Sequence, residues 1–335
     1  MKEGKIDRAY SNVKSYFGIG RKRTNNLESE RGTLLNKKEE KLRRWIEYVE
    51  ELYENGEPVG RCIEREDKVE KEDLGDTILK SEFDKALKDM KEGKAVGGDG
   101  VASELIKNAG EVTLKRLFEL TSRMYEEGEV PEDYQKSRLV MIPKKAGTRK
   151  CEDYRTISLL PHASKILTRI VHRRIQGKME ERVGEDQFGF KRGRGTREAI
   201  LCLRLVLEKR LKKGLDTYVA FVDLEKAFDN VEWARLVSML KEIDVKYKDR
   251  RVIWNLYREL KAEIKIKDKM VEARIKKGVK QGCSLSPILF NLFIEKVIEE
   301  INVRGSGVNI QGQKVRTIRF ADDNVILEGS EKELE

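Results

Sequence analysis

The segment Ile318–Leu327, IRFADDNVIL, constrains the fold most, because two adjacent acids interrupt a run that otherwise has the pattern of a buried strand. Burying Asp322 and Asp323 side by side is costly unless their pKa values rise or a cation compensates them, and carboxylate oxygens are favoured ligands of divalent metal ions. A solvent-exposed Asp-Asp turn is the simpler explanation of an isolated pair. The rest of the chain has to decide between these two interpretations.

A third acid ends another predicted strand earlier in the chain. The hydrophobic run TYVAFV at 217–222 leads directly into Asp223. If this strand end and the Asp322-Asp323 turn converge on one sheet edge, the acids can hold two Mg²⁺ ions, with Mn²⁺ as an alternative. Such a pair activates a 3′-hydroxyl and neutralises a leaving pyrophosphate, which is the chemistry of nucleotidyl transfer. A purely structural alternative treats the acids as turns and helix caps, and requires Asp223 and Asp322 to lie far apart.

Hydrophobic periodicity predicts an α+β chain of hairpins and amphipathic helices. A basic loop at 144–150 forms the tip of the first hairpin, Asp268-Lys269 the turn of the second and Asp322-Asp323 the turn of the last. The three hairpins pair 138–143 with 154–160, 262–267 with 271–275, and 315–320 with 324–327. The expected helices cover 36–55, 81–90, 102–109, 111–127, 161–183, 196–213, 248–260 and 288–301, and a further helix begins at Val231.

Charge and composition limit the classes of partner and chemistry. The chain has 70 Lys and Arg against 60 Asp and Glu, a net charge of +10, which favours a polyanionic partner, although a membrane surface would fit the same excess. Only two histidines occur, which argues against an imidazole general base, and the four cysteines form no Cys-x-x-Cys pair. No apolar run resembles a transmembrane helix or a signal peptide. We therefore expect an intracellular protein of the nucleus or cytoplasm, neither secreted nor bound to a membrane.

Several motifs occur in the order found in one known family. FVDLEKAFDNV at 221–231, QGCSLSPILFN at 281–291 and RFADD at 319–323 resemble palm motifs A, B and C of the reverse transcriptases of non-LTR retrotransposons, of the type in which an endonuclease precedes the polymerase. Upstream, GKAVGGDGV resembles the family's extension at the base of the fingers, LVMIPKK with EDYRTISLLP resembles its two fingers motifs, and EDQFGFKRGRGTREAI resembles the next block of that family. The resemblance runs from about Leu34 to the end of the chain.

The resemblance implies a right-hand polymerase fold, with fingers and a palm whose antiparallel sheet is backed by helices. It suggests a linker and helical extension at 1–75, fingers at 76–215, and a palm at 216–335 with a fingers insertion at about 245–280. Because the chain stops at Glu335, we expect a thumb-less fragment with an exposed apolar sheet edge and poor solubility. The implied partners are an RNA template, a DNA primer and dNTPs, and the oligomeric state is left open.

The resemblance also assigns residue roles. Asp223, Asp322 and Asp323 match the catalytic metal-binding acids, and the backbone carbonyl of Leu224 would complete one metal site. Phe228 matches the aromatic gate against the sugar 2′ position, with core packing as its alternative role. The matched dNTP contacts are Lys144 and Arg155 for the triphosphate, and Gln281 and Gly282 beneath the incoming nucleotide.

Two further assignments come from the residues themselves. Lys191, Arg192, Arg194 and Arg197 lie in the Gly-rich loop 189–197, which suits nucleic-acid phosphates, although a solvated turn explains the loop equally well. Asp229 is best interpreted as the cap of the helix at 231. The sequence thus predicts an RNA-directed DNA polymerase domain, and the alternative is a catalytically inactive, nucleic-acid-binding remnant of such an element.

Overall fold

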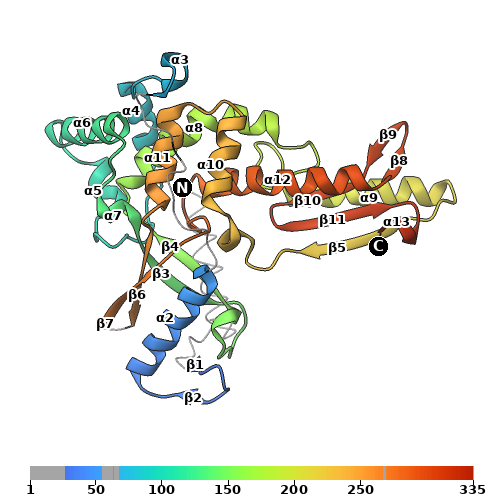
Figure 1. Ribbon diagram of the computed structural model, residues 1–335, viewed down its shortest axis with the longest axis horizontal. Helices are drawn as coiled ribbons and strands as arrows, with labels where there is room; N and C mark the ends of the chain where they lie inside the picture. The colour runs from blue at the N-terminus through green and yellow to red at the C-terminus, as the bar shows by residue number, and fades with distance from the viewer. Residues whose placement is uncertain (1–26, 55–62, 64–67, 267–268, 335) are drawn as a thin grey trace, which may run out of the picture.

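The computed structural model describes residues 27–54, 63, 68–266 and 269–334. A broad body holds most of the helices, and an elongated arm extends from it (Figure 1). We define the arm as helix α9, strands β5 and β8 to β11, and the short helix α13. The described helices are α2 (Lys38–Glu54), α3 (Lys71–Leu74), α4 (Lys80–Lys88), α5 (Ser103–Lys107), α6 (Glu111–Glu127), α7 (Glu132–Gln135), α8 (Ser164–Arg182), α9 (Thr196–Lys212), α10 (Trp233–Glu242), α11 (Tyr247–Tyr257), α12 (Ser286–Arg304) and α13 (Glu331–Leu334), with 3-10 helices η2 (Cys151–Asp153) and η3 (Ala227–Asn230).

A four-stranded sheet lies in the body, in the order β4-β3-β6-β7. Its strands are β3 (Lys136–Pro143), β4 (Tyr154–Leu159), β6 (Lys261–Ile266) and β7 (Lys269–Arg274). Both hairpins expected in this region form, but β3 also pairs with β6 in parallel, which places Leu139 opposite Ile264. Lys269, expected in the turn, instead begins β7, and Asp268 lies outside the described residues.

A three-stranded antiparallel sheet forms the arm, in the order β10-β11-β5. Its strands are β5 (Tyr218–Asp223), β10 (Thr317–Phe320) and β11 (Asp323–Glu328). Phe320 pairs with Asp323, so the turn consists of Ala321 and Asp322, and the expectation that Asp323 lies in the turn is wrong. Ala321 has a φ of +57°, the left-handed conformation that a tight two-residue turn requires.

Other boundaries also differ from those expected. Val315 belongs to β9 (Gln313–Val315), which pairs with β8 (Val308–Ile310), so β10 begins only at Thr317. Helix α10 begins at Trp233 rather than Val231. Two short strands, β1 (Leu27–Glu28) and β2 (Leu34–Leu35), pair within the region expected to be a leader. Strands of two residues, such as β1 and β2, are too short to produce a recognisable hydrophobic period in the sequence.

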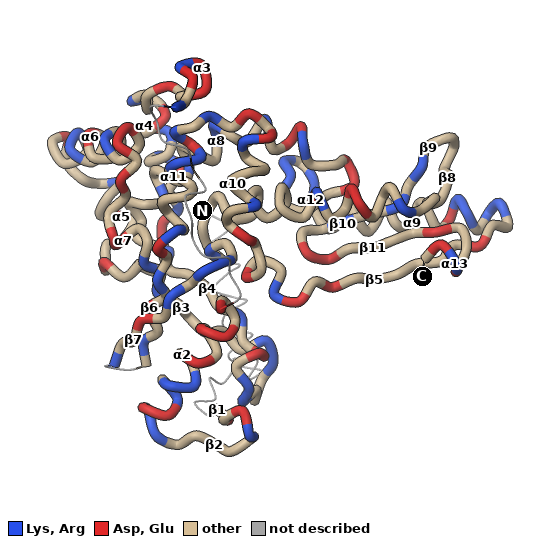
Figure 2. The backbone as a smooth tube through the Cα atoms, viewed as in Figure 1, with Lys and Arg blue, Asp and Glu red and all other residues tan. Residues whose placement is uncertain are grey.

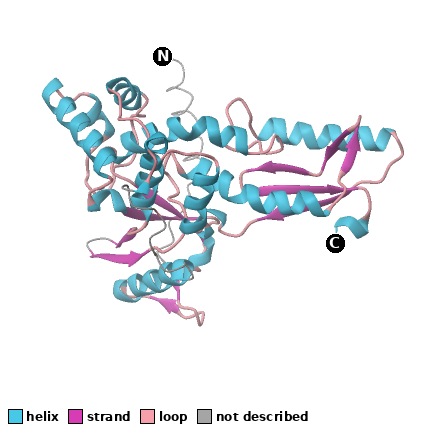
Figure 3. Cartoon of the chain, turned by 45° about the horizontal axis from the view of Figure 1, so that its top comes forward, coloured by secondary structure: helices cyan, strands magenta, loops and turns pink. Residues whose placement is uncertain are grey.

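The body and the arm have separate apolar cores. Helix α8 crosses the body core, with Ile166, Leu167 and Ile170 fully buried, and the helices pack around it (Figure 3). The arm core is small and joins α9 to the sheet through Val206, Ile318 and a few neighbours. On β5, one of the two edge strands of this sheet among the described residues, Phe221 is 75% exposed. The expectation of an exposed apolar edge with poor solubility stays a prediction. None of the described helices is both long and apolar enough to cross a membrane.

Candidate active site

Two of the three predicted catalytic acids are cross-strand neighbours. Asp323 is the register partner of Asp223 on β5. Directly opposite residues of antiparallel strands have Cα atoms about 4.5–5.5 Å apart and side chains on the same face of the sheet. Asp322 precedes Asp323 in the turn, so all three acids lie at the end of the sheet nearest the body, where Figure 2 shows acidic segments on β5 and β11. The purely structural alternative, which requires distant acids, does not agree with this register.

The three acids influence one another electrostatically. Burial is the largest cause that raises the pKa of Asp322, and the charges of Asp323 and Asp223 raise it further. A backbone hydrogen bond and the Arg155 guanidinium act in the opposite direction. Arg155 lies on β4 in the body, so the body supplies positive charge to the acidic end of the arm. Within the described part of the chain, no three His, Cys, Asp or Glu side chains are grouped closely enough to hold a metal ion.

A glutamine that sequence reasoning missed holds the turn between β10 and β11. The Gln187 side-chain oxygen accepts hydrogen bonds from the backbone N–H groups of Ala321, at 3.0 Å, and Gly189, at 2.7 Å. A Cβ on Gly189 would lie 2.3 Å from the Ala321 nitrogen, so only glycine permits this approach. The segment EDQFG, recognised only as a family block, therefore fixes the backbone that carries Asp322.

A buried arginine within β10, which sequence reasoning also missed, anchors the same hairpin to neighbouring segments. Arg319 is fully buried and forms ion pairs with Asp186, at 2.6 Å, and with Glu295 of α12, at 3.0 Å. Two carboxylates compensate one guanidinium, so the desolvated charges are all paired. A buried arginine inside an apolar strand was the available sequence signal, because such a residue needs acidic partners.

The loop after Asp223 brings Phe228 and Asp229 to the junction of arm and body. The Phe228 ring stacks on Phe290 of α12, with centroids 4.6 Å apart, and meets Phe190 edge-on. The cap role assigned to Asp229 is wrong, because α10 begins at Trp233 and Glu232 is its N-cap. The Asp229 carboxylate instead accepts a 2.7 Å hydrogen bond from the hydroxyl of Tyr53 on α2.

The predicted dNTP contacts lie on or beside the β3–β4 hairpin, Lys144 and Arg155 towards its tip and the Gln281-Gly282 loop beside Ser158. The carbonyl of Gln281 accepts a 2.8 Å hydrogen bond from the Ser158 N–H. Gly282 has a φ of +121°, and a Cβ there would lie 2.7 Å from the Ser158 carbonyl oxygen, so the Gln281-Gly282 loop is docked directly on β4. Lys144 lies in the exposed hairpin tip. Burial raises the pKa of the Asp229 carboxyl, and the charge of Lys144 is one of the effects that oppose this rise. Arg155, on the same strand as Ser158, is exposed.

In the basic loop 189–197, two of the four side chains that were predicted to contact phosphate bind other groups of the chain instead. The Lys191 ammonium donates to the carbonyls of Val183 and Gly184, both at 2.8 Å. Arg194 forms an ion pair with Glu185 and lies over the Phe188 ring. Arg192 and Arg197 are exposed. These contacts keep the loop folded, and its role with nucleic acid remains a prediction.

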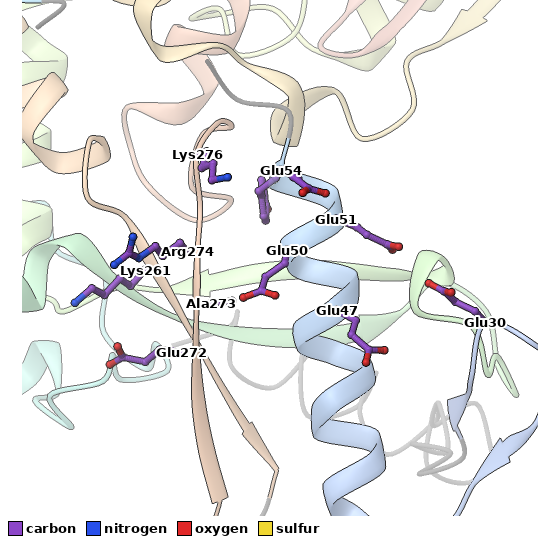
Figure 4. Close-up of a pocket in the computed structure, with 11 residues that line it drawn as sticks. Glu30, Glu47, Glu50, Glu51, Glu54, Lys261, Glu272, Ala273, Arg274 and Lys276 are labelled. Atoms are coloured by element: carbon purple, nitrogen blue, oxygen red, sulfur yellow. The ribbon is translucent and has the colours of Figure 1, made fainter. Parts of the chain in front are cut away.

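A cavity of about 970 Å³ lies between α2 and the β6–β7 hairpin, away from the three acids (Figure 4). Acidic side chains of α2, including Glu47 and Glu50, line one side. Lys261 and Arg274 belong to the opposite side. Asp223, Asp322 and Asp323 are not among the residues that line it.

Comparison with known proteins identifies relatives. A family model described as "Reverse transcriptase (RNA-dependent DNA polymerase)" matches residues 142–335. The chain is 33% identical over 238 residues to a "Retrovirus-related Pol polyprotein from type-1 retrotransposable element R2" of Nasonia vitripennis, covering 70% of this chain and 22% of that protein. It is 25% identical over 260 residues to a "Transposon TX1 uncharacterized 149 kDa protein" of Xenopus laevis, covering 77% and 20%.

A solved structure of apo telomerase from Candida tropicalis, truncated from its C-terminal domain, aligns with a TM-score of 0.47 and 15% identity, over 61% of this chain and 45% of that chain. The chain spans only 22% and 20% of the two curated relatives described above. The family model, in contrast, covers more than half of the chain, including β5, the Gln281 loop and the β10–β11 hairpin. The chain therefore belongs to the reverse transcriptase (RNA-dependent DNA polymerase) family, as a domain of the non-LTR retrotransposon type.

Proposed function

We propose that this chain extends a DNA 3′ end on an RNA template, adding dNTPs at a site formed by Asp223, Asp322 and Asp323. The observation that carries the proposal is the register of the arm sheet, which makes Asp223 and Asp323 direct partners and places Asp322 in the adjoining turn. Three carboxylates at one sheet end are a donor set suited to Mg²⁺ or Mn²⁺.

The two sheets support an assignment of subdomains. We assign the arm sheet, with α12, to a palm, and the β3–β4 hairpin to fingers, with α9 as a fingers segment that packs against the palm sheet. In this scheme residues 76–215 form the fingers and 216–335 the palm, with 245–280 returning to the fingers, while 1–75 form an extension that includes α2. The β3–β6 pairing supports the return, because it joins the strand at 261–266 to the fingers hairpin.

The acids would hold the metal ions, with the Leu224 carbonyl as an additional ligand. When bound, two divalent ions supply charge neutralisation and activation of the 3′-hydroxyl. The electrostatics of Asp322 support this assignment, because the charges of Asp323 and Asp223 both disfavour its charged form, and a cation would relieve that repulsion.

The surrounding residues would bind and orient the nucleotide. Arg155 can form a bidentate contact with a phosphate, and Lys144 can supply a point charge from the hairpin tip. Gln281 and Gly282, held against β4, would lie beneath the nucleotide. Phe228, stacked on Phe290, has a fixed ring plane that can limit space at the sugar 2′ position. Arg192 and Arg197 would contact the RNA or DNA backbone.

A primer-extension assay on an RNA template, with dNTPs and Mg²⁺, tests this function. We expect the double variant Asp322→Ala plus Asp323→Ala to lose extension, because one strand and the turn then lack their carboxylates. If wild type extends the primer no better than this variant, the chain has no such activity. Salt-sensitive RNA binding that is equal in both proteins would then identify the inactive, nucleic-acid-binding alternative.

A further inference from the structure

Helix α2 contacts the loop that follows Asp223 at two points. The Tyr53 hydroxyl donates a 2.7 Å hydrogen bond to Asp229, and both side chains are buried, with exposed fractions of 5% and 6%. Five residues earlier on the helix, the centroid of the Tyr48 ring lies 4.9 Å from the Lys226 ammonium nitrogen. Tyr53 and Asp229 are 176 residues apart in the chain. Both contacts are made with the loop 224–230.

This loop carries the groups that the proposed function places against the nucleotide. Leu224 supplies its carbonyl at one end, and Phe228 immediately precedes Asp229. Lys226 has a φ of +50°, a conformation that costs energy for a residue with a side chain and persists only where neighbouring contacts hold it. The loop therefore depends on external contacts for its shape.

The contacts around Asp229 leave the loop little freedom. The Val279 N–H donates to the Phe228 carbonyl at 2.8 Å, and a Cβ on Gly278 would lie 2.8 Å from the Asp229 carbonyl oxygen. Tyr53 and Asp229 also line one small cavity together with Gln281. The helix, the loop and the Gln281 segment thus meet at one point, and a displacement of Asp229 would move Phe228.

We propose that Tyr53 is a positioning residue, which acts through Asp229 to fix Phe228 and thereby sets the discrimination between dNTPs and rNTPs. This inference rests on the proposed function. It assigns to α2, at the N-terminal side of the chain, a specificity role in a site built from residues near 223 and 322. The hydroxyl contacts no substrate and acts only by holding the loop.

The chain offers a matched control in a second buried Tyr–Asp hydrogen bond. Tyr125 of α6 donates to Asp249 of α11 at 3.0 Å, within the body. Tyr53→Phe and Tyr125→Phe both delete one buried hydroxyl that bonds to a buried aspartate. Only the first deletion affects the loop 224–230. A purely structural role for Tyr53 predicts that the two variants behave alike.

The test compares single-nucleotide extension with dCTP and with CTP in the full 335-residue chain. We expect Tyr53→Phe to lower the ratio of kcat/KM for dCTP to that for CTP by about tenfold, the loss expected for one hydrogen bond to a buried carboxylate. Tyr125→Phe should leave the ratio unchanged. In the chain with Tyr53 intact, Asp229→Asn keeps an acceptor oxygen for the Tyr53 hydroxyl and should retain most of the discrimination, whereas Asp229→Ala should not. Equal losses with dCTP and CTP in Tyr53→Phe would overturn the inference.

Hydrogen exchange of the backbone amides gives a readout that does not depend on activity. We expect Tyr53→Phe to speed exchange in 224–230 by about tenfold over wild type, and Tyr125→Phe to leave those amides unchanged. If wild type fails to extend a primer, the proposed function fails, and the exchange result still decides whether Tyr53 holds the loop. Unchanged exchange in Tyr53→Phe would overturn the inference whether or not the chain is active.

Discussion

The two sheets of this protein are stabilised in different ways. The four-stranded sheet of the body is held by apolar side chains such as Leu139, Ala262 and Ile264, all buried in the large core. The arm sheet has a small apolar core and is supported by two fully buried charges, Arg319 and Glu328. Arg319 forms ion pairs with Asp186 and Glu295, and Glu328 forms one with Arg316. Apolar packing tolerates exchange of similar side chains, whereas a buried ion pair requires one partner at one place. The sheet that carries the three proposed catalytic acids is thus the one whose register depends on specific charges.

Replacement of Arg319 should have the largest effect on stability. Arg319→Met leaves Asp186 and Glu295 without their cation, so we expect a loss of about 3–5 kcal/mol in the free energy of unfolding. Arg138→Met is the matched change in the body sheet, where Arg138 is partly exposed and lies 3.9 Å from Glu263. That change should cost less than the loss of Arg319, because the Arg138 side chain is partly exposed and only one carboxylate loses its cation. Urea unfolding measures both, and equal losses would contradict the proposed difference between the sheets.

The body contains one buried acid whose charge is incompletely compensated, and this should make stability depend on pH. Burial raises the pKa of Asp249 to about 6, despite opposing effects of Arg174 and Tyr125. A raised pKa favours the folded state while the carboxyl is protonated, so this stabilisation is complete below about pH 3.9 and is lost as pH rises through about 6.

The control for this pH effect is Asp249→Asn, which cannot ionise. Relative to this variant, wild type should lose up to about 3 kcal/mol between pH 4 and pH 7, because about two pKa units separate the folded and unfolded states. Urea unfolding at several pH values measures the difference between the two proteins. A constant difference across this range would show that Asp249 does not titrate in it.

Gly189 should be intolerant of any side chain. Gly189→Ala places a Cβ 2.3 Å from the Ala321 nitrogen, and the resulting shift should cost about 1–3 kcal/mol. Gly177→Ala, inside α8, meets no atom within 4 Å and should stabilise the chain by about 0.5–1 kcal/mol. Thermal unfolding compares the two variants. Primer extension should fall only in Gly189→Ala, and equal extension would mean that the turn does not depend on this approach.

The exposed ion pairs of the arm should contribute least. Arg204 and Glu208 lie one turn apart on α9, with side chains 74% and 44% exposed. Arg204→Ala should change stability by about 0.5 kcal/mol or less, and the change should shrink in high salt. Urea unfolding with and without roughly 0.5 M NaCl, a concentration that screens surface charges, measures this change in stability. A salt-independent loss above 1 kcal/mol, roughly the upper limit for such pairs, would mean that surface charge also supports the arm.

Local patterns predicted the hairpins but not the contacts between distant segments. The β3–β4 and β10–β11 hairpins follow from alternating runs with turns between them, and the family motifs located all three acids. The parallel β3–β6 pairing and the Tyr53–Asp229 hydrogen bond join segments more than a hundred residues apart, and no local periodicity encodes such partners. The error at Asp229 has the same origin, because an aspartate before a helix has the pattern of a cap.

The register of Asp223 with Asp323 also has a consequence for the order of folding. The β10–β11 hairpin closes over two residues, and such hairpins form within microseconds, whereas β5 joins it from 100 positions earlier in the chain. Closing that long loop costs entropy that only the finished sheet repays. We therefore expect the three carboxylates to meet late, so that a partly folded chain would hold Asp322 and Asp323 without Asp223 and would bind divalent ions weakly.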